Sequence, residues 1–237
     1  MTLLSICVRA LDEISSFNVP DYIIGNTDDT AKQLLAFAKK VGTELIRDYD
    51  WQEMITETTF TTSVDVRSYD VPSDYERIVS DTTWDRTTRR SVLGNSTARQ
   101  WNALRAVAIT TAQTFRFRVI RNQVTLERNP AAGIEFAYEY LSKNYCESSG
   151  GTDQAEWTND TDLPLIPEDL FINGIRYYFL KANNLPYGDA EGEYDAVIAS
   201  RQGKNTPSGI VNMSANVCRP GRRKFYRINI PESVPIV

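Results

Sequence analysis

The sequence has no histidine among its 237 residues. This absence excludes imidazole as a catalytic base, proton shuttle or metal ligand, and with it Ser-His-Asp hydrolysis and histidine-ligated zinc. Cysteine is scarce as well. Cys7, Cys146 and Cys218 are far apart in the chain, so neither a CxxC zinc site nor a dithiol redox site is indicated. An odd number of cysteines without a signal peptide predicts synthesis in a reducing compartment.

Long apolar runs and glycine-rich phosphate loops are also missing. No apolar stretch approaches the roughly 18 residues of a membrane span, and neither a P-loop nor a GxGxxG motif occurs. The apolar content of 41% and the charged content of 24% are ordinary for a globular protein, and the chain is long enough for one large domain or two small ones. We expect no membrane span, no cofactor and no metal.

Charge of one sign is scarce in two stretches of the chain, each of which has a single acidic residue, 86–128 and 201–237. The net charge of −5 divides into −9 over residues 1–85, +8 over 86–128, −10 over 129–200 and +6 over 201–237. Every basic residue in 86–128 is arginine, which suits pairing with carboxylates or phosphates. These blocks could pair within one fold or between copies in an assembly. Attraction of the whole protein to nucleic acid is not predicted.

Apolar residues at helical spacing predict helices at both ends of the folded region. We expect helices from Leu3 to Phe17, from an N-cap at Thr27 to about Tyr49, from Pro167 to the break at 183–186, and from Asp189 to about Arg201. A shorter helix is expected over 97–107. Their apolar stripes are typical of core packing and carry no binding signature.

Alternation and β-branched residues predict strands between the helices. We expect strands at 56–63, 68–72, 78–84, 115–120, 123–127 and 134–141, with a hairpin turn at Arg121-Asn122. The last three should form one sheet, in which Arg116 and Arg118 lie near Glu127, Glu135 or Glu139. Ser73 and Glu76 have capping-box spacing and predict a helical turn. Residues 147–164 are expected to form a long polar loop.

Three stretches of the chain resemble the head-to-tail adaptor family of short-tailed bacteriophages, also called tail accessory factors or tubular tail protein A-like adaptors. The first stretch is 46–53, which ends in Asp-Tyr-Asp-Trp-Gln-Glu. The second is 69–78, followed by Thr83-Trp84-Asp85-Arg86, Gly94 and Trp101. The third is the strand 136–140 with Trp157, Asp160, Asp162, 163–168 and the helix to 185–187. Their order and spacing carry the resemblance over about residues 28–200.

The resemblance implies a structural protein that is not an enzyme. Such adaptors form a ring, usually of twelve copies, that joins the portal protein to the tail, seals the DNA exit channel and offers a platform for the next tail or nozzle protein. Viral DNA passes through the channel without sequence-specific binding. The implied location is the head–tail junction of the virion, reached from the host cytoplasm during assembly.

The predicted fold is α+β: a bundle of N- and C-terminal helices with an inserted antiparallel β-rich domain and an extended C-terminal tail. The predicted division is 1–56 helical, 57–163 β-rich, 164–202 helical and 203–237 tail. The tail has no apolar period, but its stretch 219–231 mixes five positive charges with large apolar residues. We expect it to dock as a strand on the portal or a neighbouring subunit. The expected docking residues are Arg222, Arg223, Lys224, Phe225, Tyr226, Arg227, Ile228 and Ile230.

Two other functions stay open at this point. The acids of the polar loop could serve a virion-associated cell-wall glycosidase or gather a cation, although their spacing is not that of an EF-hand. These acids are Glu147, Asp153, Glu156, Asp160 and Asp162. Arg116, Arg118 and Arg121 could instead form a DNA-binding surface.

We favour pairing of the arginines with carboxylates within the sheet and between subunits, because acidic blocks flank them on both sides. The arginines expected at the subunit interface are Arg86, Arg89 and Arg90. Trp51, Trp84, Trp101 and Trp157 could anchor interfaces, with at least two of them buried in a core.

Overall fold

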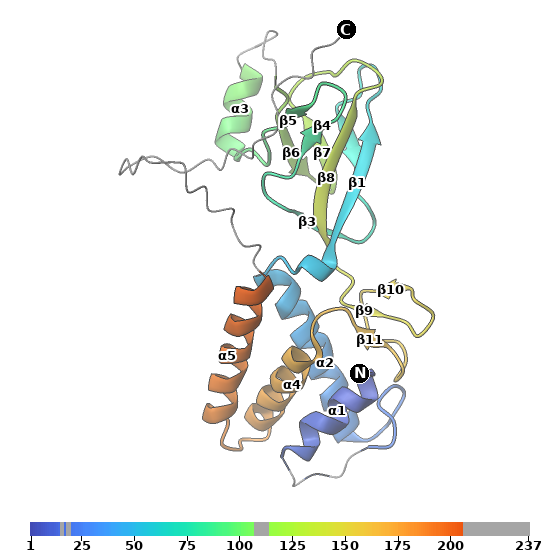
Figure 1. The fold of residues 1–237 in the computed structure, drawn as a ribbon, viewed down its shortest axis with the longest axis vertical. Coiled ribbons are helices and arrows are strands. Elements are labelled where there is room, and N and C mark those ends of the chain that lie inside the picture. The colour runs from blue at the N-terminus through green and yellow to red at the C-terminus, as the bar shows by residue number, and fades with distance from the viewer. Residues whose placement is uncertain (15–16, 18–19, 107–113, 206–237) are drawn as a thin grey trace, which may run out of the picture. The chain divides into compact units, whose positions relative to one another are not determined.

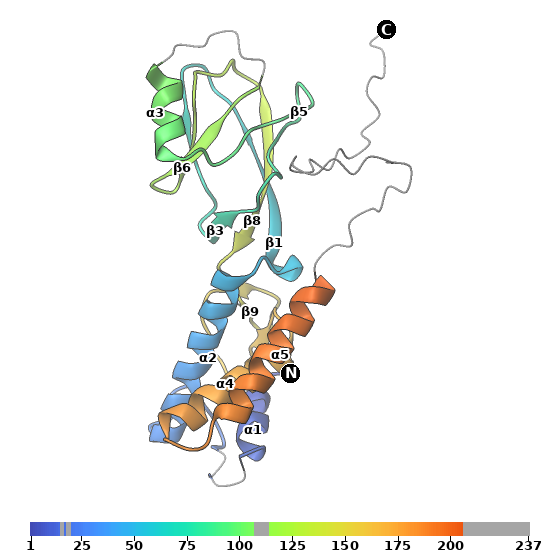
Figure 2. The ribbon, with the colours of Figure 1, turned by 90° about the vertical axis from the view of Figure 1, so that its left-hand side faces the viewer.

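Four long helices pack together in the computed structural model, which describes residues 1–14, 17, 20–106 and 114–205. They are α1 (Leu3–Asp12), α2 (Asp29–Asp48), α4 (Glu168–Ala182) and α5 (Gly188–Asn205). Both Figure 1 and Figure 2 show them as one group, in which α4 contacts each of the other three. Close packing of α4 on α2 depends on Gly174, where an added Cβ would lie 2.8 Å from the side chain of Val41.

The ends of three helices differ from the predictions. α1 stops at Asp12, short of Phe17, because the chain tightens there: the Ile14 amide donates to the carbonyl of Leu11, three residues back. α2 has Asp28, rather than Thr27, at its N-cap. α5 continues four residues past Arg201, so residues 203–205 of the predicted tail are helical. The rest of the tail, 206–237, lies outside the described residues.

The largest sheet is antiparallel and has β8 (Glu135–Ser142) at its centre. On one side β8 pairs with β1 (Ile55–Thr61), and on the other with β3 (Tyr75–Ile78) and β4 (Trp84–Asp85), which in turn pairs with β5 (Arg90–Ser91). A short 3-10 turn, η1 (Gln52–Met54), joins α2 to β1. The side chains of Phe60, Phe136, Tyr138 and Tyr140 share an aromatic core beneath one face of this sheet.

A second sheet contains the predicted hairpin. β6 (Phe117–Ile120) and β7 (Gln123–Leu126) are joined at Arg121-Asn122, and β2 (Ser68–Asp70) pairs with β7. Both turn residues have positive φ, 50° and 58°, as a two-residue hairpin turn requires. The expected short helix is α3 (Ala98–Ala106).

The prediction that β8 extends this hairpin is wrong. β8 belongs to the first sheet, and the two sheets share a core through ring contacts such as Phe115 with Phe136 at 5.4 Å and Phe60 with Tyr69 at 4.5 Å. Glu135 and Glu139 are therefore on a different sheet from Arg116 and Arg118. Aromatic alternation indicated which residues are buried, but not that they come from two sheets.

Two local predictions between residues 73 and 84 are also wrong. Ser73 and Glu76 do not cap a helical turn: the Tyr75 amide donates to the Pro72 carbonyl at 3.1 Å, and β3 begins there. The expected strand 78–84 is divided, because β3 ends at Ile78 and β4 begins at Trp84. Pairing with β8 overrides the local capping pattern.

The predicted polar loop is partly a small sheet. β9 (Cys146–Glu147) lies between β10 (Asp153–Gln154) and β11 (Leu163–Pro164). Cys146 and Trp157 are buried in the core of the helices, although the predicted division assigned them to the β-rich domain. The fold class α+β is confirmed, and within the described residues no helix is long and apolar enough to span a membrane.

Candidate interaction surfaces

The arginine-bearing turn between β4 and β5 is fixed by a buried acid. Asp85, 2% exposed, accepts hydrogen bonds from the backbone amide and the hydroxyl of Thr88, at 2.8 and 2.6 Å. This Asx turn holds Arg86 and Arg89 at the surface, and Arg89 has a positive φ of 56°. The expected interface arginines therefore come from one short, rigid hairpin.

Arg86 forms ion pairs within its own chain. Its guanidinium contacts the carboxylate of Glu57 on β1 and that of Glu135 on β8, the latter at 3.7 Å. Across the sheet, Glu57 lies directly opposite Glu139, a like-charge pair that costs stability. No ion pair within the described residues includes Glu139. Arg86 thus pairs with two of the three carboxylates on this face of the sheet.

The other arginines of the basic block are dispersed. Arg121 is exposed at the hairpin turn, whereas Arg116 and Arg118 are half-buried on and beside β6. Arg128 lies 4.3 Å over the ring of Phe115 and 3.5 Å from Glu127. The three arginines of the DNA-binding hypothesis therefore do not form one exposed cluster.

Three acids of the predicted loop, Glu156, Asp160 and Asp162, hold backbone amides or a lysine. The Asp160 carboxylate accepts from the amides of Ile23 and Ile24, the latter at 2.8 Å. Asp162 is fully buried and accepts from the amides of Thr158 and Asn159, at 2.7 and 2.8 Å. Both fix the loop that receives the first turn of α1, because the Leu3 and Leu4 amides donate to the Asp162 and Asp160 carbonyls.

Glu147 and Asp153 lie directly opposite each other where β9 pairs with β10. Glu156 and the nearby thiols have structural contacts. Glu156 accepts from Lys39 at 2.7 Å, and this contact lowers the pKa of its carboxyl. Burial, followed by the nearby charges of Asp160 and Asp162 respectively, raises the pKa of the Cys7 thiol and of the Cys146 thiol to about 12. Over the described ranges, no group of three or more His, Cys, Asp or Glu side chains could hold a metal ion.

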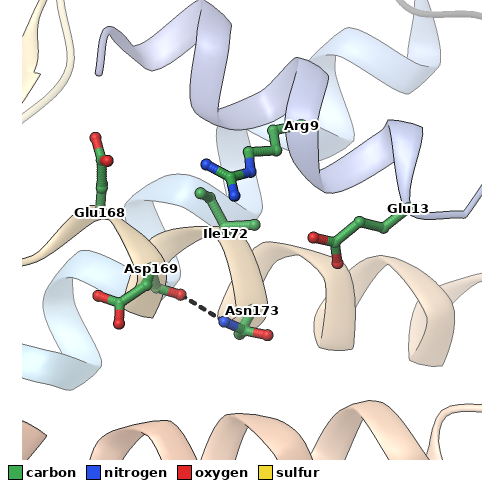
Figure 3. A pocket seen from close by; sticks show the side chains of 6 residues that line it. All are labelled: Arg9, Glu13, Glu168, Asp169, Ile172 and Asn173. Atoms are coloured by element: carbon green, nitrogen blue, oxygen red, sulfur yellow. Dashed lines mark hydrogen bonds between the residues drawn. The ribbon is translucent and has the colours of Figure 1, made fainter.

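A hollow of about 100 Å³ lies between α1 and α4 (Figure 3). Charged and polar side chains line it, and its acids are engaged at its rim. Glu168 pairs with the N-terminal amine at 2.7 Å, Glu13 with Arg176 at 3.1 Å, and Asp169 with Arg201 at 2.8 Å. Its lining residues are Arg9, Glu13, Glu168, Asp169, Ile172 and Asn173.

Residues that carry the resemblance connect the helices to the sheets. Arg77 on β3 donates to the carboxylate of Asp50 at 2.8 Å and to the Ile46 carbonyl at the end of α2 at 2.7 Å. Trp51 is 1% exposed, and its indole N–H donates to the Leu45 carbonyl at 2.9 Å. These two stretches of sequence are therefore structural.

Other predicted sites divide between the core and the undescribed segment. Trp51, Trp101 and Trp157 are buried, which confirms that at least two tryptophans are core residues, and Trp84 is half-buried. The docking residues expected in the tail, from Arg222 to Ile230, lie outside the described residues. The sequence reasoning missed the open edge of β1. Threonine-rich alternation at 56–63 indicated a strand, but not its place at the border of a sheet.

Residues 1–211 match the family model described as SU10 adaptor protein, which includes all of the described residues. The chain therefore belongs to this family of structural phage adaptors. No curated protein matches the chain.

Proposed function

We propose that this member of the SU10 adaptor family forms a ring below the phage portal, seals the DNA exit channel and provides a platform for the next tail or nozzle protein. The ring is expected to contain twelve copies, as the resemblance to adaptors of short-tailed phages implies. The protein acts in the virion at the head–tail junction, and it assembles in the host cytoplasm. The observation that carries this proposal is the adaptor-family match over residues 1–211.

The arrangement of the acids supports a structural role over the glycosidase alternative. Glycoside hydrolysis needs two carboxyl groups that face each other across a substrate. Asp160 and Asp162 instead accept hydrogen bonds from backbone amides, and Glu156 pairs with Lys39. The partial burial of Arg116 and Arg118 likewise favours passage of DNA without tight phosphate contacts.

Binding to the portal tests the proposal directly. The full chain is mixed with the portal protein of the same phage, and the complex is imaged by electron microscopy. The expected result is an extra ring of density on the tail side of the portal. Intact protein that neither binds the portal nor adds density there would refute the proposal. Breakdown of bacterial cell walls incubated with the protein would favour the glycosidase.

We also propose that the pure protein is largely monomeric and that the portal templates the ring. Interface arginines then act across subunits. Because Arg86 already serves its own sheet, reversal of Arg89 is the cleaner test. Arg89→Glu should weaken ring formation, whereas Arg99→Glu, on the exposed side of α3, should not. Light scattering of the pure chain checks the monomer, and a stable ring without portal would contradict it.

A further inference from the structure

β1 is an edge strand of the largest sheet. On one side it pairs with β8 through residues 55–61, and within the described residues no strand pairs with its other side. Thr62 shows which residues of this stretch direct their backbone groups toward β8. Its amide donates to the Ile134 carbonyl, and its carbonyl accepts from the Gly133 amide. The amides and carbonyls of Glu57, Thr59 and Thr61 therefore point away from β8. Seven residues of open edge can accept another strand.

The two faces beside this edge have opposite character. One face presents the acidic group of Glu57, Glu135 and Glu139, of which Arg86 pairs with Glu57 and Glu135. The other face carries Phe60 and the aromatic core. A strand added at this edge would complement both faces if its side chains alternated between basic, on the acidic face, and apolar, on the aromatic face.

Exposed apolar side chains extend the edge beyond the strand. Val64 and Val66 lie in the loop that directly follows β1 and are 64% and 41% exposed. Two exposed valines, two residues apart, add apolar surface next to the open edge. The edge and this loop form one continuous stretch of chain, and we call residues 55–66 the β1 border.

The C-terminal segment leaves the described structure next to the start of the β1 border. The Asn205 side chain accepts from the Gln52 amide at 3.1 Å and donates to Glu53 at 2.9 Å, just before β1 begins. Beyond Asn205 the sequence alternates in the stretch 223–230: Arg223, Phe225, Arg227 and Asn229 occupy one set of positions, and Lys224, Tyr226, Ile228 and Ile230 the other. The first set holds two arginines with Phe225 between them, and the second is apolar except for Lys224. We call them the cationic set and the apolar set, and they correspond to the acidic face and the aromatic face of the border.

The spacer between them is longer than pairing within one chain needs. Residues 206–222 span up to about 60 Å when extended, whereas the seven residues of β1 cover about 24 Å. Parallel pairing with its own β1 would need almost no spacer, and antiparallel pairing would need only the length of the strand. The excess length, with Pro207, Gly209, Pro220 and Gly221, fits a crossing to an adjacent copy.

We propose that residues 223–230 of one copy add a strand to the β1 border of a neighbouring copy. This proposal rests on the proposed ring and specifies what links its subunits. Main-chain hydrogen bonds to Glu57, Thr59 and Thr61 supply the affinity, and the cationic set lies against the acidic face. The apolar set continues the aromatic face.

Disulfide trapping tests this pairing. All proteins carry Cys218→Ser, and Cys7 and Cys146 remain because they are buried. Thr59→Cys is combined in one full chain with Phe225→Cys, Arg227→Cys or Asn229→Cys in turn, since the register is to be found. Isotope-labelled and unlabelled protein are mixed, oxidised at high concentration and digested. The matched control replaces Thr59→Cys with Asn102→Cys on the exposed surface of α3.

The expected result is mixed-isotope cross-linked peptides, several-fold more abundant with Thr59→Cys than with Asn102→Cys. Cross-links within single-isotope chains alone would place the tail on its own β1 and overturn the assignment to a neighbour. Equal yields at positions 59 and 102 would overturn the docking site itself. The oxidation is carried out with the portal protein and, at high protein concentration, also without it, so that the pairing between copies is measured separately from portal binding. Cross-linking between copies without any binding to the portal would support the strand pairing but refute the adaptor function. Portal binding without cross-linking between copies would refute only the strand pairing.

Discussion

The helices and the sheets of this protein use their side chains differently. In the helical part (α1, α2, α4 and α5), the core closes on itself, and the charged residues around it are paired, as Arg176 is with Glu13 and Glu193. In the β part (β1–β8 with α3), a strand edge stays open and two valines in a loop are exposed. Glu57 and Glu135 share Arg86, and among the described residues no ion pair includes Glu139.

This difference separates stability from assembly. The helical part gains its stability from burial of large apolar and aromatic side chains, the dominant favourable contribution to folding. The β part leaves a strand edge, carboxylates and two exposed valines that are open to contact with another chain. Substitutions in the helical core should therefore change the free energy of unfolding, whereas substitutions at the β1 border should change association.

The largest effect is expected at Trp51, between the two parts. Trp51→Ala should lower the free energy of unfolding by about 3–5 kcal/mol, because it leaves a cavity and an unpaired Leu45 carbonyl. Trp51→Phe keeps the aromatic ring but loses the hydrogen bond, so it should cost less. Urea unfolding followed by circular dichroism measures both. A loss below 1 kcal/mol for Trp51→Ala would show that this position is not part of the core.

A smaller effect is expected at the contact of Arg77 with α2. Arg77→Met removes charge-assisted hydrogen bonds to Asp50 and to the Ile46 carbonyl and should cost about 1–3 kcal/mol. Arg47→Met is the matched control, since Arg47 is 67% exposed and reaches Asp48 only at 4.0 Å. Equal unfolding curves for the two variants would mean that Arg77 does not stabilise the connection.

The ion pair of Lys39 and Glu156 should make a small contribution to the free energy of unfolding, and this contribution should depend on pH. Lys39 lowers the pKa of Glu156 in the folded protein, so the stabilisation is complete above the ordinary glutamate pKa of 4.5 and is lost as the pH falls through the lowered value. Because the pair is exposed, Lys39→Met should cost at most about 0.2–1 kcal/mol at pH 7. Urea titrations at pH 7 and pH 3 compare the variant with the parent chain. A difference that persists at pH 3 would contradict this account.

The smallest effect on stability is expected at the β1 border. Val64→Ser with Val66→Ser should change the free energy of unfolding by less than about 0.5 kcal/mol, because both side chains are largely exposed. The same change should weaken assembly on the portal, measured by sedimentation of the complex. Ile120→Ser, at an exposed position beside the hairpin turn, is the control. Substantial unfolding of the double variant would place the valines in the core instead.

The sequence predicted the helices and the hairpin turn well, because these depend on near neighbours. The stripe of α2, the turn at Arg121-Asn122 and the early acids of α4 were all recognisable. Pairing between distant strands was less accessible: β8 was placed beside the hairpin, although it pairs with β1, β3 and β4. Alternation identifies the buried face of a strand, but it carries no information about the neighbouring strand.

The candidate site shows the same limit. Charge blocks indicated that arginines and acids would meet, but not that Arg86 would bridge Glu57 and Glu135 on two different strands. Asp160 and Asp162 resembled a catalytic or metal-binding group by composition. Only their contacts with the amides of Ile24 and Asn159 identify them as structural acids.

Hydrogen exchange on the portal-bound protein tests the central claim, that the β part carries the contacts between copies. Amides of Glu57, Thr59 and Thr61 point away from β8, so they should exchange quickly in the isolated chain and slowly in the complex. The helical amides within α2 should exchange equally in both states and provide an internal control. The predicted result is slower exchange of amides in the β1 border in the complex than in the isolated chain. Slower exchange confined to the helices, with β1 unchanged, would contradict the account.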